Sequence, residues 1–210
     1  EEYPITYIMF IEPAFNNVGH RGWIEVICGP MFSGKTEELL RRLKRSQIAG
    51  QQVAIFKPVA DKRYSSDSIV SHNKNNIASI SVDKPMEIIN HRGRAKIVGI
   101  DEVQFFNHQI VEIAQQLALD NVRVIAAGLD MDYLGKPFGP VPELLATAEF
   151  VTKVHAICMI CGSLATHSFR KEKNDSRVML GADNEYMPLC RKCFNEEMGK
   201  KKEHERTIAE

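Results

Sequence analysis

Residues 29–36, Gly-Pro-Met-Phe-Ser-Gly-Lys-Thr, form a complete G-x-x-x-x-G-K-[ST] phosphate-binding loop. Glycines at both ends let the backbone wrap around a phosphate, and successive N–H groups and the N-terminus of a following helix point at its oxygens. The Lys35 ammonium can reach the outer phosphates, and the Thr36 hydroxyl can ligate magnesium. The motif therefore predicts a nucleoside-triphosphate site, with eight candidate phosphate-binding residues: Gly29, Pro30, Met31, Phe32, Ser33, Gly34, Lys35 and Thr36.

An acidic pair ends a second apolar run, Ile-Val-Gly-Ile-Asp-Glu at residues 97–102. Proteins with a phosphate-binding loop place a magnesium-directed aspartate at such a strand end. Asp101 is the better candidate for the metal, and Glu102 can then face an acceptor pocket as a base. The alternative is a pair of solvated acids at the start of a loop, where acidic residues are common.

Four cysteines form a C-x2-C…C-x2-C set: Cys158, Cys161, Cys190 and Cys193. Two such pairs offer four thiolates to one ion, which suits a structural zinc with no open coordination position. Such a metal would tie together the ends of segment 162–189, which has too few apolar residues to fold by packing alone. Two disulfides are the alternative, although no secretory signal supports them. The fifth cysteine, Cys28, is expected to fill space on a buried strand.

Elements of regular structure alternate around these residues. Strands are expected at 23–28, 53–56, 77–81, 95–100 and 122–127, and helices after the phosphate-binding loop and at 85–91, 108–118 and 142–147. In the first helix, Leu39, Leu40 and Leu43 fall near one face. Alternating strands and helices predict an α/β fold, with a parallel sheet covered by helices on both faces.

The chain divides into four expected parts. Residues 1–22 show no clear period and form an N-terminal extension, and 23–150 form the α/β domain with the phosphate-binding loop. Residues 151–194 form a small zinc-binding domain, and the polar segment 195–210 is expected to be a disordered tail.

Composition excludes several classes of function. The chain has 210 residues, of which 44% are hydrophobic, as expected for one globular domain with a small addition. Lys plus Arg and Asp plus Glu both number 27, so no net positive charge attracts DNA or RNA. No apolar run approaches a membrane span, and no signal peptide is evident, so a cytoplasmic protein without membrane or nucleic-acid partners is expected.

Taken together, the motifs resemble the cellular-type, zinc-containing thymidine kinases. The resemblance covers residues 22–194 and rests on residues 29–36, 101–106, 128–130, 136–139, the cysteine pairs and 181–186. It implies that ATP and magnesium supply a γ-phosphoryl group to the 5′-hydroxyl of thymidine, while a lasso held by the zinc domain closes over the base. It also implies a homotetramer and feedback inhibition by dTTP.

The resemblance also implies roles for single residues. Thr36 and Asp101 serve magnesium, Glu102 takes the proton of the hydroxyl, and Arg63 is the phosphate-side arginine. Ser168 stands where the family usually has threonine, and Phe169 where many bacterial relatives have glutamine. The implied thymidine contacts are Met31, Phe105, Leu129, Tyr133, Phe138, Ser168 and Tyr186.

Two other functions fit the same motifs. One is a kinase of another deoxynucleoside or of a nucleoside monophosphate. The other is an ATP-dependent nucleic-acid-binding protein whose zinc domain grips a strand. Residues 158–193 mix acids and bases without a basic stripe, which disfavours the second.

Overall fold

The computed structural model describes residues 21–59, 68–70, 76–171 and 185–209. Its main body is a six-stranded sheet of order β5-β2-β6-β7-β1-β8, in which all neighbouring strands are parallel. The strands are β1 (Trp23–Cys28), β2 (Val53–Pro58), β5 (Ile80–Val82), β6 (Ile97–Ile100), β7 (Arg123–Gly128) and β8 (Phe150–Lys153). The prediction of a parallel sheet in an α/β fold is confirmed.

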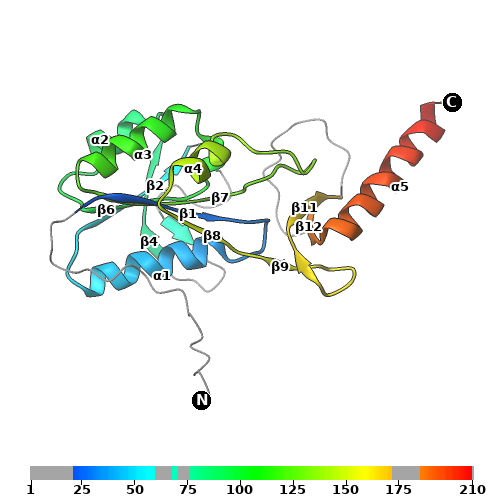
Figure 1. The fold of residues 1–210 in the computed structure, drawn as a ribbon, viewed down its shortest axis with the longest axis horizontal. Coiled ribbons are helices and arrows are strands. Elements are labelled where there is room, and N and C mark those ends of the chain that lie inside the picture. The colour runs from blue at the N-terminus through cyan, green and yellow to red at the C-terminus, as the bar shows by residue number, and fades with distance from the viewer. Residues whose placement is uncertain (1–20, 60–67, 71–75, 172–184, 210) are drawn as a thin grey trace, which may run out of the picture.

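Helices cover both faces of this sheet (Figure 1). One face carries α1 (Lys35–Ile48), whose Leu39, Leu40 and Leu43 are buried against Ile55 and Ile125 of the sheet. Burying a leucine side chain contributes about 1.5–3 kcal/mol, so this contact fixes the helix that follows the phosphate-binding loop. The other face carries α2 (Met86–His91), α3 (Gln109–Leu119) and α4 (Val141–Thr147).

Three further short elements lie close to the sheet in sequence. A 3-10 helix, η1 (Val103–Phe105), follows the acidic pair. Strands β3 (Ser68–Val70) and β4 (Asn76–Ala78) form a separate antiparallel pair. The prediction of a single strand at 77–81 is therefore wrong. The segment contains parts of two strands, β4 and β5, separated at Ser79, and only β5 joins the main sheet.

The sheet extends further along the chain than the sequence indicates. Strand β8 pairs with β1, so the expected boundary at residue 150 falls inside a strand of the main sheet. As an edge strand, β8 alternates half-buried and exposed residues, and Val151 is 48% exposed. It lacks the continuous apolar run that reveals the central parallel strands.

The C-terminal module contains two small antiparallel pairs and a long helix (Figure 1). Strands β9 (Ala156–Ile157) and β10 (Leu164–Ala165) form one pair, and β11 (His167–Arg170) and β12 (Tyr186–Leu189) form the other. A separate small core joins these strands to the start of α5 (Arg191–Ala209). The module thus has its own apolar centre beside the main body.

Helix α5 continues to Ala209, so the disordered tail expected for 195–210 differs from the structure. The physical reason is local. Lys192 and Glu196 lie four residues apart and approach to 4.0 Å, and Lys200 and Glu197 form a 2.6 Å ion pair three residues apart. Such pairs support a helix in a segment that has few apolar residues.

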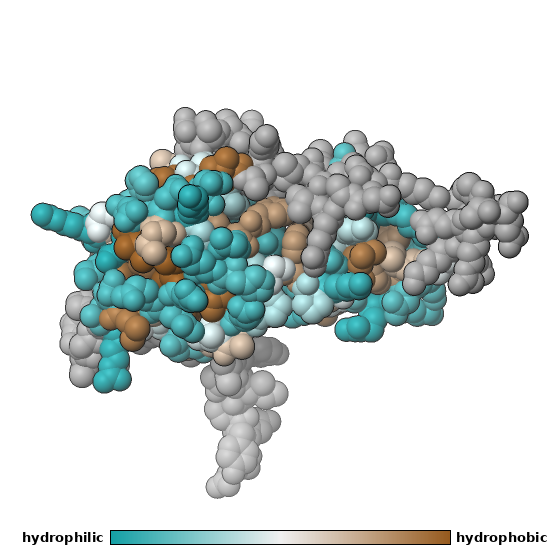
Figure 2. Space-filling view, turned by 90° about the horizontal axis from the view of Figure 1, so that it is seen from above, coloured by the Kyte–Doolittle hydropathy of each residue, from teal (hydrophilic) through white to brown (hydrophobic). Residues whose placement is uncertain are grey.

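Figure 2 shows the molecule from the side of α2, α3 and α4, where the described surface is largely hydrophilic with small apolar groups between. Met86 and Leu119 are among the exposed large apolar residues. In the part of the chain that the structure describes, no helix has the length and apolar character needed to cross a bilayer.

Candidate active site and zinc centre

The phosphate-binding loop connects β1 to α1, as the sequence predicts. Gly29 has φ +151°, and a Cβ there would lie 2.2 Å from the carbonyl oxygen of Val154, so only glycine fits. Gly34 has φ +80° and directly precedes α1, and Phe32 also lies in the left-handed region at φ 63°. These conformations turn the chain around the space at the helix N-terminus, where backbone N–H groups attract anions.

Lys35 is buried at the base of this loop. Its Nζ donates a 2.7 Å hydrogen bond to the carbonyl oxygen of Pro30, and the Ser33 hydroxyl donates to the same oxygen at 2.7 Å. The ammonium group is therefore held within the loop by a backbone acceptor. An anion in the loop would face both the lysine charge and the helix N-terminus.

The acidic pair lies at the same edge of the sheet. Strand β6 ends at Ile100, and the next residue, Asp101, is 6% exposed. The Thr36 hydroxyl donates to Asp101 Oδ2 at 3.1 Å, which joins the phosphate-binding loop to the acidic pair. Burial and the neighbouring Glu102 carboxylate raise the pKa of Asp101 to about 7. A divalent cation beside Asp101 would favour its charged form.

Glu102 is half-buried and adopts an uncommon backbone conformation. Its φ of 51° lies in the left-handed region, which residues other than glycine rarely adopt. Gln104 Nε2 donates a 2.5 Å hydrogen bond to Glu102 Oε2. The carboxylate is therefore held beside Asp101 by a neighbouring amide.

Four of the seven expected thymidine contacts form two pairs. Phe105 and Phe138 meet edge to face, with ring centroids 5.9 Å apart. The backbone N–H of Met31 donates to Ser168 Oγ at 2.9 Å, so the phosphate-binding loop contacts β11 directly. A fifth expected contact, Leu129, follows β7 and is 9% exposed.

Arg170 lies next to the two remaining aromatic residues, Tyr133 and Tyr186. Its guanidinium carbon lies 3.6 Å from the ring centroid of Tyr133, and Arg170 is opposite Tyr186 in the β11–β12 register. Because alternate residues on a strand share a face, Arg170 and Ser168 lie on the same side of β11. Phe169 faces the other way and packs on Phe194, with centroids 6.3 Å apart. The departure at Phe169 therefore changes the core of the C-terminal module.

The predicted arginine, Arg63, lies outside the described residues, as do residues 1–20 of the expected extension. Cys28 is 1% exposed in the main core, which confirms its expected role as a buried filler. Burial, together with the charge of Asp130, raises the pKa of this thiol to about 11.

Sequence reasoning missed a buried charge cluster behind the loop. Glu25 accepts 2.6 Å hydrogen bonds from Arg42 Nη1 and Arg123 Nε, and all three side chains are at most 3% exposed. Burial opposes ionisation of Glu25, but the two arginines outweigh it and lower its pKa. The cluster ties α1 to β1 and β7, and so helps to fix Lys35 and Thr36. Its members are far apart in sequence, so no local pattern could reveal it.

A second ion pair that the sequence did not indicate lies at the strand ends. Lys153 Nζ of β8 is 2.6 Å from Asp130 Oδ2, just beyond β7. Strand β1 lies between these two strands, so the pair spans the point where the phosphate-binding loop begins. Asp130 lies in segment 128–130, one of the segments that carry the resemblance to the thymidine kinases, and no other feature of the sequence indicates this ion pair.

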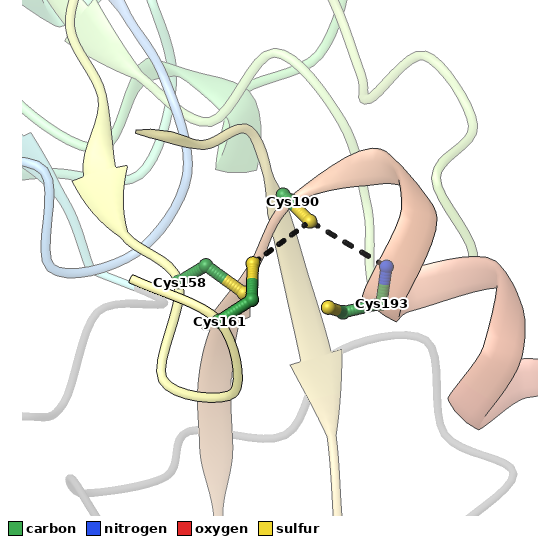
Figure 3. Close-up of side chains that lie close together, drawn as sticks. All are labelled: Cys158, Cys161, Cys190 and Cys193. Atoms are coloured by element: carbon green, nitrogen blue, oxygen red, sulfur yellow. Dashed lines mark hydrogen bonds between the residues drawn. The ribbon is translucent and has the colours of Figure 1, made fainter. Parts of the chain in front are cut away.

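The four predicted cysteines lie together in the C-terminal module (Figure 3). Their sulfur atoms all lie within 4.8 Å of one another, and Cys161 Sγ is 3.6 Å from Cys190 Sγ. A zinc ion about 2.3 Å from each of four sulfurs requires sulfurs about 3.8 Å apart. The donor set and its spacing therefore fit a structural zinc ion with four thiolate ligands.

The environment of the thiols also favours metal binding. Burial opposes ionisation of Cys158, but backbone N–H groups of Cys190, Cys161 and Ile160 outweigh it and lower its pKa to about 6. Burial and the neighbouring sulfurs raise the pKa of Cys193 to about 12. Without a cation, one thiolate opposes ionisation of the next, and a bound cation would remove this opposition.

Comparisons with known proteins find a matching family model and several similar relatives. The family model described as "Thymidine kinase" matches residues 22–194. A thymidine kinase of Porphyromonas gingivalis is 59% identical over 174 residues, covering 83% of this chain and 85% of that protein. A thymidine kinase of Rhodothermus sp. is 54% identical over 84% of this chain and 83% of the relative. One from Bacteroides thetaiotaomicron is 52% identical over 89% and 94%, respectively.

Proposed function

Because the chain belongs to the thymidine kinase family, we propose that it transfers the γ-phosphoryl group of ATP to the 5′-hydroxyl of thymidine. The products are then ADP and thymidine 5′-monophosphate, a precursor for DNA synthesis. The observation that best supports this reaction is the Thr36–Asp101 hydrogen bond. It brings a phosphate-binding loop, a candidate metal ligand and a candidate base to one edge of the sheet.

The proposed donor site is the loop of residues 29–36. Its backbone N–H groups and the N-terminus of α1 would bind the phosphates of ATP, and Lys35 would move from Pro30 to the outer phosphates. Arg63 is proposed to add a second cation on the phosphate side. Thr36 and Asp101 would hold magnesium, which supplies charge neutralisation on the phosphate oxygens.

Glu102 is the proposed base. Phosphoryl transfer needs the attacking hydroxyl aligned with the γ-phosphorus and a group that takes its proton. Glu102 lies beside the candidate metal ligand Asp101, and its carboxylate is held by a hydrogen bond. The proton of the 5′-hydroxyl would pass to this carboxylate as the oxygen attacks.

The proposed thymidine pocket lies between the loop and the C-terminal module. Ser168 contacts Met31 in the loop, and Arg170 of the same strand contacts Tyr133. These contacts support a pocket whose far wall is carried by the zinc-binding module. A closed module would exclude water, which otherwise competes as acceptor. The proposed wall comprises Met31, Phe105, Leu129, Tyr133, Phe138, Ser168 and Tyr186.

The reaction is tested with ATP labelled in the γ-phosphate. Thymidine should become labelled when magnesium is present, and 5′-deoxythymidine, which lacks the acceptor hydroxyl, should not. Label on 5′-deoxythymidine, or release of labelled phosphate without transfer, would refute transfer to the 5′-oxygen.

The zinc centre yields a prediction that distinguishes global unfolding from a local loss of thymidine binding. Replacing Cys190 with Ser is expected to lower zinc content from about one ion per chain and to weaken thymidine binding more than ATP binding. The reason is that the metal pins the module carrying Ser168 and Tyr186, whereas the loop lies on the main sheet.

Zinc content by elemental analysis and both affinities by calorimetry check this expectation. Met159→Ala, at an exposed position of the same cysteine turn, is the matched control. Equal weakening of both ligands would indicate global unfolding, and unchanged thymidine binding would overturn the proposed role of the module.

Feedback inhibition of the kinase by dTTP is a further proposal, based on the family. dTTP should inhibit, because its base can occupy the thymidine pocket while its phosphates reach the loop. Inhibition constants for dTTP and deoxycytidine triphosphate check this, and equal inhibition by the two would contradict it. A cytoplasmic homotetramer is proposed on the same family basis.

A further inference from the structure

Gln104 is a buried amide that lies between the acidic pair and the end of β7. It belongs to η1 and is 2% exposed. Its Oε1 accepts a 3.0 Å hydrogen bond from the backbone N–H of Leu129, and its Nε2 donates to Glu102 Oε2 at 2.5 Å. One side chain thus links Glu102 to the first residue after β7.

Chemistry fixes which way this amide points. The backbone nitrogen of Leu129 can only donate, so the amide oxygen must face it. The NH2 group then faces Glu102, whose ionised carboxylate can only accept. A reversed amide would place two donors together at Leu129 and two acceptors together at Glu102.

Packing holds Gln104 in this orientation. A Cβ at Gly128 would lie 2.6 Å from Gln104 Oε1, and a Cβ at Gly139 would lie 2.5 Å from the Gln104 carbonyl oxygen. The two glycines therefore let the chain approach Gln104 closely, Gly128 at the side-chain amide and Gly139 at the backbone carbonyl. The Gln104 amide oxygen is therefore packed against the backbone of Gly128, and the Gln104 backbone is packed against Gly139.

We propose that Gln104 is a positioning residue that holds the Glu102 carboxylate toward the acceptor hydroxyl. The inference rests on the proposed role of Glu102 as base. Glu102 has a left-handed backbone and a half-buried side chain, so the Gln104 amide restricts where its carboxylate can lie. The bond to Leu129 sets this position relative to a residue of the proposed thymidine pocket.

The test is a double-mutant cycle on kcat. Gln104→Met keeps the side-chain length and removes the amide, and it should lower kcat by about 10- to 100-fold, because a small displacement of a reacting group has an effect of this size. The KM values for ATP and thymidine should change less than about threefold. In a Glu102→Ala background the same substitution should change kcat less than about threefold, because the positioned group is absent.

Gln109→Met, at an exposed glutamine of α3, is the control and should keep wild-type kcat. If Gln104→Met does not fold, as judged by its melting curve, the cycle is run with Gln104→Glu. This variant keeps an oxygen that accepts the hydrogen bond from the Leu129 N–H. It replaces the NH2 group that faces Glu102 with a carboxylate oxygen, which cannot donate.

Each outcome of the cycle has one meaning. Equal loss of kcat in both backgrounds would overturn the inference and leave the kinase function intact. A wild-type kcat for Gln104→Met would overturn it as well. A wild-type kcat for Glu102→Ala would refute Glu102 as base and the inference with it, whereas failure of the wild-type protein to phosphorylate thymidine would refute the proposed function itself.

Discussion

Replacing Glu102 with Gln is expected to lower kcat by about 10²-fold or more. The amide keeps the size of the side chain and loses the ability to take a proton from the 5′-hydroxyl. The phosphate-binding loop does not depend on Glu102, because Lys35 and Ser33 are held by the Pro30 carbonyl oxygen. ATP affinity should therefore remain within about twofold of the wild type.

Steady-state kinetics and calorimetric ATP titration check this prediction. Glu112→Gln, on an exposed position of α3, is the matched control and should leave kcat unchanged. Near-normal turnover of Glu102→Gln would mean that the base lies elsewhere or that none is needed.

Replacing Lys35 with Ala is expected to lower kcat/KM for ATP by about 10²- to 10³-fold, the typical effect of removing one group that stabilises transition-state charge. Lys35 is buried at the base of the loop, where the ammonium charge is poorly screened by water. Its loss should reduce both ATP binding and phosphoryl transfer, whereas the affinity for thymidine alone should change little.

Lys84→Ala, at an exposed lysine before α2, is the control for loss of a positive charge. Initial rates at several ATP concentrations give the comparison. A Lys35→Ala variant with kcat/KM within threefold of the wild type would contradict the assignment of residues 29–36 as the donor site.

The meeting of the loop and the acidic pair could be predicted from the sequence. Both follow apolar strands, and parallel strands place their carboxyl ends at one edge of a sheet. Strand β7 lies between β1 and β6, so a single intervening strand separates the two motifs. The Thr36–Asp101 contact is the direct result of this order.

The cysteine cluster could also be predicted, because each C-x2-C pair forms a local turn and one ion with four ligands requires the pairs to meet. The sulfur positions confirm the grouping.

Residues that act through distant contacts could not be predicted in the same way. Gln104 was visible as part of a motif, and its bond to Glu102 is local, but its bond to Leu129 depends on the distance between η1 and the end of β7. Arg170 likewise acquires its contact with Tyr133 only when β11 reaches the main body. Glu25 reads as one polar residue in an apolar strand until Arg42 and Arg123 are placed around it.

Selectivity among deoxynucleosides tests the central proposal most directly. The measurement is kcat/KM for thymidine, deoxycytidine, deoxyadenosine and deoxyguanosine with ATP and magnesium. Thymidine should exceed each of the others by at least about 100-fold, because a closed pocket leaves buried polar groups unpaired when the wrong base is bound. Turnover of deoxycytidine equal to that of thymidine would contradict the account.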